Sequence, residues 1–348
     1  MVDPFEKIGA LKNYWHVIAL VSEIKRGSSI KRELYGHRFL IWRDQAGVFH
    51  ALTDCCAHKK APLEVADFNQ NKIVCPYHGW EYDQNGTLTN IPSSPSCCEK
   101  LKCKVGDFLV CEKYDFVWIY LGDPKLPKNG IPDLARFDSW SKCFLKKEFQ
   151  TSEDLLIDNF MDPTHTGLVH DGLIRSSQNS CEHCVKVTTS ELGVLVDFEE
   201  QTEAVGLGMR FLFGKEMRVK HTDEFLFPNL VRVIYAINGV ERFVALIACS
   251  PNEKLNGPST TAFVQLRYNF GWSTPLVSPF VKGLAGKVFK QDFEITQKQS
   301  ENRDQFPDLK ENLIAADVVA SQVAKLRRKF VAGDCQIRET VQEFKLRF

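Results

Sequence analysis

Two short segments carry most of the information in this sequence: Asp54-Cys55-Cys56-Ala57-His58, and Cys75-Pro76-Tyr77-His78-Gly79-Trp80 further along the chain. If Cys56 is the first ligand, the spacing is Cys-x-His, then sixteen residues, then Cys-x2-His. Two thiolates on one iron and two imidazoles on a second iron, joined by sulfides, form a cluster whose neutral His ligands raise its reduction potential. The pattern therefore predicts a [2Fe-2S] cluster bound by Cys56, His58, Cys75 and His78.

The alternative for these segments is a Cys2His2 zinc site. Zinc fingers usually pair two Cys in one segment with two His in another. Here each segment mixes one Cys with one His, and the following Gly79-Trp80 also favours the cluster. Cys55 stands close to His58 as well, so spacing alone leaves the choice between Cys55 and Cys56 open.

A second metal-binding pattern spans residues 158–170, which read DNFMDPTHTGLVH. Two His and one carboxylate form a facial triad that leaves open positions on Fe(II). On a regular helix, the five residues from His165 to His170 turn the side chain by about 140°. The two rings can therefore meet only if the helix is distorted or ends between them, which Pro163 and Gly167 allow. The alternative is a pair of ordinary surface or core histidines.

The third ligand is expected far along the chain, in residues 288–296 (VFKQDFEIT). In a helix, Val288, Phe289, Asp292 and Ile295 share one face. A carboxylate on an apolar face is costly unless a partner such as a metal compensates its charge. Asp292 is therefore the predicted third ligand, and the alternative is a carboxylate at the edge of the stripe that reaches water.

The rest of the chain has the composition of a globular protein. Its 348 residues include 44 Lys plus Arg and 44 Asp plus Glu, so there is no basic bias that would indicate nucleic acid. No apolar run approaches the ~18 residues of a membrane span, and the first residues do not read as a signal peptide. A cytoplasmic protein is expected, with its 12 Cys as reduced thiols and metal ligands.

The order of predicted elements indicates an α+β fold. Short strands, among them 15–21, 38–42, 48–52, 72–74, 108–110 and 116–121, follow an N-terminal arm or short helix over 1–13 and end at a Pro-, Lys- and Gly-rich loop over 123–132. Beyond the loop we predict a helix at 150–170, strands at 185–189, 194–198, 209–213, 231–237, 243–248 and 262–270, and helices at 280–300 and 309–331. This predicts a small antiparallel β domain over residues 1–128 and a larger domain over 129–348, with one antiparallel sheet flanked by helices.

Together the two motifs resemble the Rieske non-haem iron oxygenases, from about Trp15 to about Arg303. The chain is similar to the members that consist of an α subunit only, which include aromatic O-demethylases and ring hydroxylases. The resemblance selects Cys56 over Cys55 as the cluster ligand. It also implies a small Rieske domain followed by a catalytic domain that holds mononuclear Fe(II) through His165, His170 and Asp292.

The resemblance implies further roles and partners. Asp162 would carry electrons between subunits of a homotrimer, from His78 of one subunit to His165 of the next, and Asn159 would lie close to the iron. A separate reductase or ferredoxin, fed by NAD(P)H, would supply the electrons for O2 activation, because the chain has no Gly-rich nucleotide fingerprint. Neither a membrane nor nucleic acid is expected as a partner.

The substrate is expected to be an apolar small molecule, aromatic or polycyclic, that undergoes hydroxylation or oxidative dealkylation. A cluster of Phe suggests this class, although these side chains would equally fill a sheet core: Phe211, Phe213, Phe225 and Phe227. The same scaffold also supports desaturation, ring cleavage and dihydroxylation, and a non-catalytic Rieske electron-transfer protein is a further alternative. Cys181-x2-Cys184 lies outside the motifs and is read as two inert thiols rather than a second metal or redox site.

Overall fold

The computed structural model describes residues 3–125, 130–171, 173, 182–204, 216–254 and 257–347. The chain forms two compact units. The first comprises Met1–Ile8, Lys12–Ile131 and Asn252–Leu255, and the second comprises Gly9–Leu11, Pro132–Pro251 and Asn256–Phe348. The predicted boundary between residues 128 and 129 lies outside the described residues, so we keep it as a proposal.

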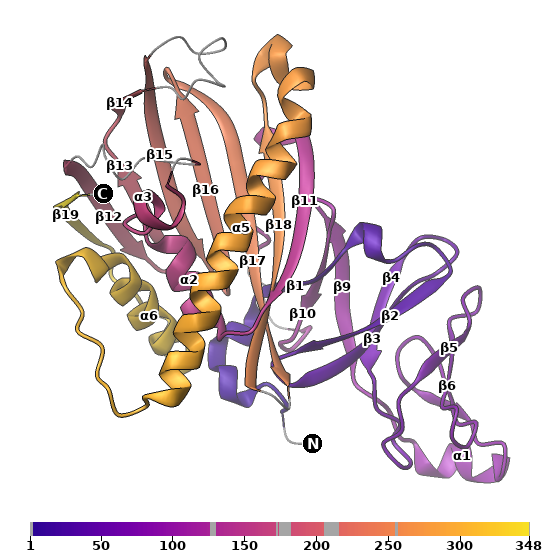
Figure 1. Cartoon of the computed structure of the whole chain (residues 1–348). Coiled ribbons are helices and arrows are strands. Elements are labelled where there is room, and N and C mark those ends of the chain that lie inside the picture. Colours follow the sequence, from indigo (N-terminus) through magenta and orange to yellow (C-terminus); the bar gives the residue numbers. More distant parts are fainter. Residues whose placement is uncertain are drawn as a thin grey trace. The chain divides into compact units, whose positions relative to one another are not determined.

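The first unit contains two antiparallel sheets (Figure 1). One has the order β1-β10-β9-β4-β3-β2, made of β1 Trp15–Leu20, β2 Ser28–Leu34, β3 His37–Arg43, β4 Phe49–Thr53, β9 Asp107–Lys113 and β10 Phe116–Tyr120. The other has the order β5-β6-β7-β8, made of β5 Glu64–Asp67, β6 Lys72–Val74, β7 Glu81–Tyr82 and β8 Leu88–Asn90. The short helices η1 Glu6–Asn13, η2 Val21–Glu23 and α1 Pro95–Leu101 complete this part of the chain.

The second unit is built on one large sheet. Its order is β11-β18-β17-β16-β15-β13-β12-β19, and β14 pairs with β15. The strands are β11 Ser141–Phe149, β12 Glu182–Ser190, β13 Gly193–Phe198, β14 Gln201–Ala204, β15 Glu216–Leu226, β16 Leu230–Ile237, β17 Val240–Lys254, β18 Gly257–Tyr268 and β19 Thr340–Arg347. Helices α2, α3, α5 and α6 lie on one face of this sheet (Figure 1). The predicted α+β class, a small β domain followed by a larger domain with one antiparallel sheet and helices, is confirmed.

The helices of the second unit are α2 Glu153–Met161, α3 Thr166–Val169, α5 Thr274–Gln305 and α6 Val318–Val331, with short 3-10 turns η3 Ala135–Phe137, η6 Gly271–Ser273 and η7 Ala315–Asp317. Helix α2 begins where the Ser152 side chain accepts a hydrogen bond from the Leu155 amide. It ends because Asp162, which precedes Pro163, has an extended backbone at φ −88° and ψ 111°. The break in the predicted 150–170 helix therefore lies before His165, and Gly167 sits inside α3.

Three details of the sequence prediction are wrong. Residues 309–314 are not helical, and the helix of this region begins at η7. Ile295 is 43% exposed, whereas Thr296 is fully buried beside Asp292, because α5 turns a narrower face toward the sheet than the apolar pattern suggests. Asn269 and Phe270 also fall after the end of β18. The predicted strand at 209–213 lies outside the described residues.

Candidate metal centres and substrate pocket

The two Cys/His segments form tight turns of the same kind in the first unit. The Cys56 amide donates to the Ala61 carbonyl, and the Lys60 amide donates back to the Cys56 carbonyl. In the second segment, the Cys75 amide donates to the Trp80 carbonyl and the Gly79 amide to the Cys75 carbonyl. Gly79 has φ +70°, a conformation that glycine adopts without strain. Local backbone hydrogen bonds therefore fix both thiols.

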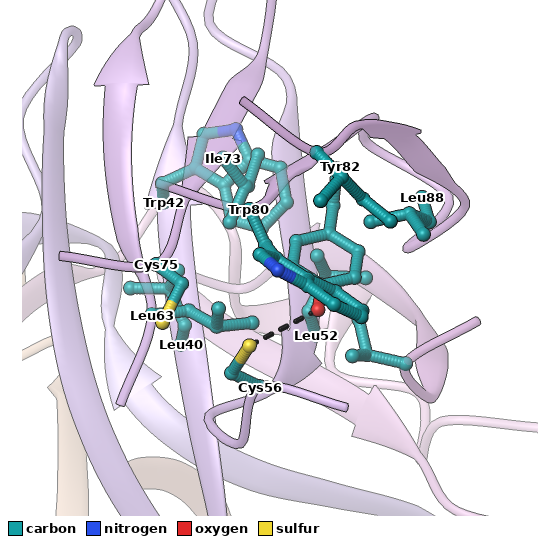
Figure 2. Packing of buried hydrophobic residues seen from close by; sticks show 12 residues of the cluster. Leu40, Trp42, Leu52, Cys56, Leu63, Ile73, Cys75, Trp80, Tyr82 and Leu88 are labelled. Atoms are coloured by element: carbon teal, nitrogen blue, oxygen red, sulfur yellow. Dashed lines mark hydrogen bonds between the residues drawn. The ribbon is translucent and has the colours of Figure 1, made fainter. Parts of the chain in front are cut away.

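The Cys56 and Cys75 side chains are each only 1% exposed and belong to an apolar cluster with Trp80 and Tyr82 (Figure 2). The Ala57 amide donates to the Tyr82 hydroxyl at 3.2 Å, and the hydroxyl in turn lies 3.1 Å from Cys56 Sγ (Figure 2). Because the Tyr82 oxygen already accepts a hydrogen bond, its own proton is available to the sulfur.

The two imidazoles of this site, His58 and His78, are exposed. The ring centroids of His58 and His78 are 4.7 Å apart, and His58 stacks on Trp80 at 4.6 Å with an interplanar angle of 1°. Buried thiols and exposed imidazoles suit two irons with different ligands.

The distances between the donor atoms also favour the cluster over the zinc alternative. Donors around one tetrahedral zinc would lie within about 4 Å of one another, given bonds of about 2.0–2.3 Å. Across the part of the chain that the structure describes, one group of three or more metal-binding side chains has ligand atoms all within 4.8 Å, and that group lies in the second unit. No three of Cys56, His58, Cys75 and His78 meet this condition, which argues against a single shared ion.

That group is His165, His170 and Asp292. The two Nε2 atoms are 3.3 Å apart, and Asp292 Oδ1 lies 3.5 Å from His165 Nε2 and 3.1 Å from His170 Nε2. Three donors at right angles around one ion, with bonds of about 2.1 Å, would be about 3.0 Å apart. The observed spacing therefore fits a facial triad, and His165 and His170 meet because they lie at opposite ends of the one-turn helix α3.

The hydrogen bonds of the two Nδ1 atoms, which face away from the triad, also support a metal site. His165 Nδ1 lies 2.7 Å from the Asp162 carbonyl, and His170 Nδ1 lies 2.9 Å from Gln291 Oε1. Both partners are acceptors, so each Nδ1 carries the proton and each Nε2 presents a lone pair toward the other. Two facing lone pairs beside a buried carboxylate need a cation between them, and the donor set therefore fits a metal ion.

The pKa values of Asp292 and His165 also indicate that the site favours a positive charge. Burial pushes the pKa of Asp292 upward, but hydrogen bonds with His165 and His170 outweigh it and hold the pKa at about 2. Burial pushes the pKa of His165 downward, but Asp162 and Asp292 raise it to about 9. The Asn159 amide also donates to Asp292 Oδ1 at 3.1 Å, so Asn159 contacts a predicted ligand.

Asp162 plays two roles in the local backbone. Its Oδ1 accepts hydrogen bonds from the Thr164 amide at 2.7 Å and from the Thr164 hydroxyl at 2.6 Å, which fixes the turn into α3. Its carbonyl, rather than its carboxylate, holds His165, since Oδ2 lies 3.8 Å from His165 Nδ1. The Asp162 side chain as a whole is 35% exposed.

A cavity of about 330 Å³ adjoins the triad, within the usual range for small-molecule sites. Its walls are mostly apolar and come from β15–β18, α2 and α5, and they include Phe160, Tyr235, Phe243, Phe270, Phe280 and Phe289. Phe225 and Phe227 do not line it, because they pack with each other and Phe227 stacks on Phe330 of α6. Phe211 and Phe213 lie outside the described residues.

The remaining cysteine motif shows no metal site in the described residues. Cys184 is exposed on β12, and a hydrogen bond with Glu199 raises the pKa of its thiol. A raised pKa disfavours the thiolate that metal binding and redox chemistry require. Cys181 lies outside the described residues.

Comparison with known proteins agrees with this architecture. Residues 14–108 match the Rieske [2Fe-2S] domain, and residues 149–333 match the vanillate O-demethylase oxygenase C-terminal domain, which spans more than half of the chain. The two matches define the class of protein: a Rieske [2Fe-2S] domain followed by an oxygenase C-terminal domain, the domain pair of the Rieske oxygenases. Within this class, the chain belongs to the family with the vanillate O-demethylase oxygenase C-terminal domain. A Rieske [2Fe-2S] domain is present, and oxygenases of this family use mononuclear Fe(II).

Individual relatives are distant. The iron-sulfur subunit TsaM1 of the toluene-4-sulfonate monooxygenase system from Comamonas testosteroni is 31% identical over 163 residues, 46% of each chain. Chlorophyllide a oxygenase of Oryza sativa is 30% identical over 49% of this chain and 30% of its own length. Among solved structures, dicamba monooxygenase bound to dicamba has a TM-score of 0.75 at 20% identity, covering 93% of this chain and 98% of its own. NdmA of Pseudomonas putida has a TM-score of 0.74 at 18% identity, covering 98% of both chains.

The chain matches between about a quarter and a half of the length of the curated relatives. Within the described ranges, no helix is long and apolar enough to cross a membrane.

Tyr82→Phe should lower the reduction potential of the cluster. The Tyr82 hydroxyl lies 3.1 Å from Cys56 Sγ. A thiolate sulfur bound to iron can only accept, so with Cys56 as a cluster ligand the hydroxyl would donate and stabilise the more negative, reduced state. Loss of a hydrogen bond worth about 1 kcal/mol corresponds to a decrease on the order of 50 mV. Protein-film voltammetry measures the potential, and an unchanged value would mean that the hydroxyl does not donate to the sulfur.

Asp158→Asn should stabilise the protein at neutral pH. Burial and the nearby Asp162 charge raise the pKa of Asp158 from 3.8 to about 6. The folded state then holds this proton more tightly than the unfolded state, so stability falls as the pH rises from about 4 to about 6 and stays lower above it. The variant should raise the free energy of unfolding at pH 8 by up to about 3 kcal/mol. Denaturant unfolding at pH 4, 6 and 8 tests this, and a pH profile that matches the wild type would contradict it.

Proposed function

We propose that this protein uses O2, and electrons that originate from NAD(P)H, to hydroxylate or oxidatively dealkylate an apolar, aromatic or polycyclic small molecule. The observation that carries the proposal is the position of the His165, His170 and Asp292 triad on the wall of a 330 Å³ cavity. An electron-transfer protein has no use for an iron site with open positions beside a cavity.

The proposal assigns a role to each predicted ligand. Cys56 and Cys75 would hold one iron of the cluster, and His58 and His78 the other. His165, His170 and Asp292 would hold the mononuclear iron, whose contribution when bound is to activate O2 with electrons from the cluster. Buried Asp292, 2% exposed, neutralises part of the metal charge, while the Asp162 carbonyl and Gln291 keep both imidazoles in the metal-binding tautomer.

The rest of the chain would bind and orient the substrate. The apolar walls exclude water from the reacting carbon, and the aromatic side chains fix the plane of a flat substrate against α5. NdmA and NdmB of Pseudomonas putida are methylxanthine demethylases, and dicamba monooxygenase is a monooxygenase, so relatives with this fold support hydroxylation or dealkylation of small ring compounds.

The proposal includes partners and an assembly. A separate reductase or ferredoxin would reduce the cluster. In a homotrimer, a heterologous ring, Asp162 would connect His165 to His78 of a neighbouring subunit. The partly exposed Asp162 carboxylate is the feature of this chain that supports such a contact. We place the protein in the cytoplasm.

Metal analysis tests the proposal directly. Protein purified without oxygen should contain about three irons and two acid-labile sulfides per chain, with a Rieske-type EPR signal after dithionite. Two irons and two sulfides, with no third iron after Fe(II) is added, would contradict the mononuclear site and the oxygenase activity. Zinc without sulfide would contradict both sites.

A further inference from the structure

The cavity beside the triad contains a polar pair that binds no metal in the proposal. His221 and Asp223 lie on β15 and are each 5% exposed. Because side chains alternate along a strand, residues two apart face the same way, and both side chains line the cavity. Their directly paired neighbours on β16, Tyr235 and Val233, line it too.

The His221 ring is held in a fixed plane. It stacks on Phe198 with a centroid distance of 3.8 Å and an angle of 17°, and on Tyr235 at 5.2 Å and 18°. Phe198 lies on β13 and Tyr235 on β16, the strands that flank β15 on either side. The ring nitrogens therefore point along the plane between them, and Nε2 lies 3.7 Å from Asp223 Oδ2.

The charge of this pair restricts what the cavity can accept. A buried carboxylate repels an anion and accepts a hydrogen bond, while an imidazole beside it can donate or accept one. The described residues that line the cavity include no Lys or Arg, which an anionic substrate would need for its own charge. Apart from Tyr235, which carries a hydroxyl, the other polar residues of the lining lie at the triad and its flanking turn: Asp162, Thr166 and the three predicted ligands.

We propose that His221 and Asp223 form the hydrogen-bonding subsite of the cavity and select neutral, flat, apolar substrates that carry a hydroxyl or similar group, while excluding carboxylates and sulfonates. This inference rests on the proposed function, since it treats the cavity as the substrate site. It separates the chain from the relative TsaM1, whose system is named for a sulfonate.

A matched ligand series tests the subsite on the metal-loaded protein, without oxygen and therefore without turnover. Isothermal titration with naphthalene, 2-naphthol and 2-naphthoate keeps the ring constant and changes only the substituent. We expect 2-naphthol to bind about tenfold more tightly than naphthalene, and 2-naphthoate to bind more weakly than either. Equal affinity for 2-naphthol and naphthalene, binding of none of the three, or tightest binding of 2-naphthoate overturns the proposal.

Two variants separate recognition from support of the fold. His221→Phe keeps the stacked ring and should remove the tenfold preference for 2-naphthol while leaving the affinity for naphthalene unchanged. Asp223→Asn should improve the binding of 2-naphthoate by removing the repelling charge. Thr222→Val, on the opposite face of the same strand, is the control and should keep the wild-type order. If His221→Phe weakens all ligands alike, the pair only supports the sheet and the proposal fails.

Iron content, measured on the same samples, keeps the two proposals apart. Selective binding in protein that never acquires mononuclear iron would contradict the oxygenase function and leave the subsite standing. Full iron content and turnover, without a preference among the three ligands, would contradict the subsite and leave the oxygenase function standing.

Discussion

Replacing His170 with Ala is expected to abolish turnover, by roughly a thousandfold or more, and to release the mononuclear iron. His170 is 1% exposed and contributes Nε2 at 3.1 Å from Asp292 Oδ1, so no other described side chain is positioned to take its place. The [2Fe-2S] cluster lies in the other unit and should stay intact. Iron and sulfide analysis should therefore give about two irons and two sulfides per chain.

Leu168→Ala is the matched control for this variant. Leu168 lies on the same one-turn helix α3 but is 77% exposed and does not line the cavity. Its iron content and turnover should equal those of the wild type. A His170→Ala protein that keeps its third iron and its turnover would refute the assignment of the triad.

Asp162→Asn is expected to lower turnover by roughly 10–100-fold while both metal sites stay filled. Asn can still accept the hydrogen bonds from Thr164 through its side-chain oxygen, so the turn into α3 should persist. The substitution removes the negative charge that would connect His165 to a neighbouring subunit. The expected defect is slow electron transfer, seen as slow reoxidation of the reduced cluster when substrate and O2 are mixed in a stopped-flow instrument.

Asp158→Asn provides the matched control, because it removes a neighbouring carboxylate of α2 that contributes no predicted metal ligand. Its rate of cluster reoxidation should equal the wild-type rate. Reoxidation of Asp162→Asn at the wild-type rate would exclude the electron-bridge role. Loss of iron from Asp162→Asn would instead assign Asp162 to holding His165 in place.

The sequence was most informative where function depends on local spacing. The Cys56 and His58 pair and the Cys75 and His78 pair each lie within one turn, so the pattern of residues indicated the kind of site, and only the choice between Cys55 and Cys56 needed the family resemblance. The break in the helix before His165 could also be predicted, because Pro163 restricts the backbone of the residue before it. The position of Asp292 on the buried side of a helix followed from its apolar neighbours.

The proposed substrate subsite could not be predicted because it depends on how distant strands pair. Residues 216–226 (EMRVKHTDEFL) look like a charged surface segment, yet the odd positions from Val219 to Phe225 all face inward. The alternation of Val219, His221, Asp223 and Phe225 was the available signal: two polar residues on the buried face of a strand. Gln291 was missed for a different reason, since its contact with His170 joins residues 121 positions apart.

Helix α5 supplies Asp292 to the triad and Gln291 to His170, and its residues Phe280, Leu284 and Val288 form part of the cavity wall. Any rotation of this helix that makes room for a bulky substrate would also displace Asp292, the predicted metal ligand. Substrate binding and iron binding would therefore both depend on the position of α5. Thermodynamic linkage then requires each ligand to change the affinity of the other by the same factor. A substrate that fits without moving α5 should leave the iron affinity unchanged, whereas a substrate too large for the cavity should lower the affinity for iron.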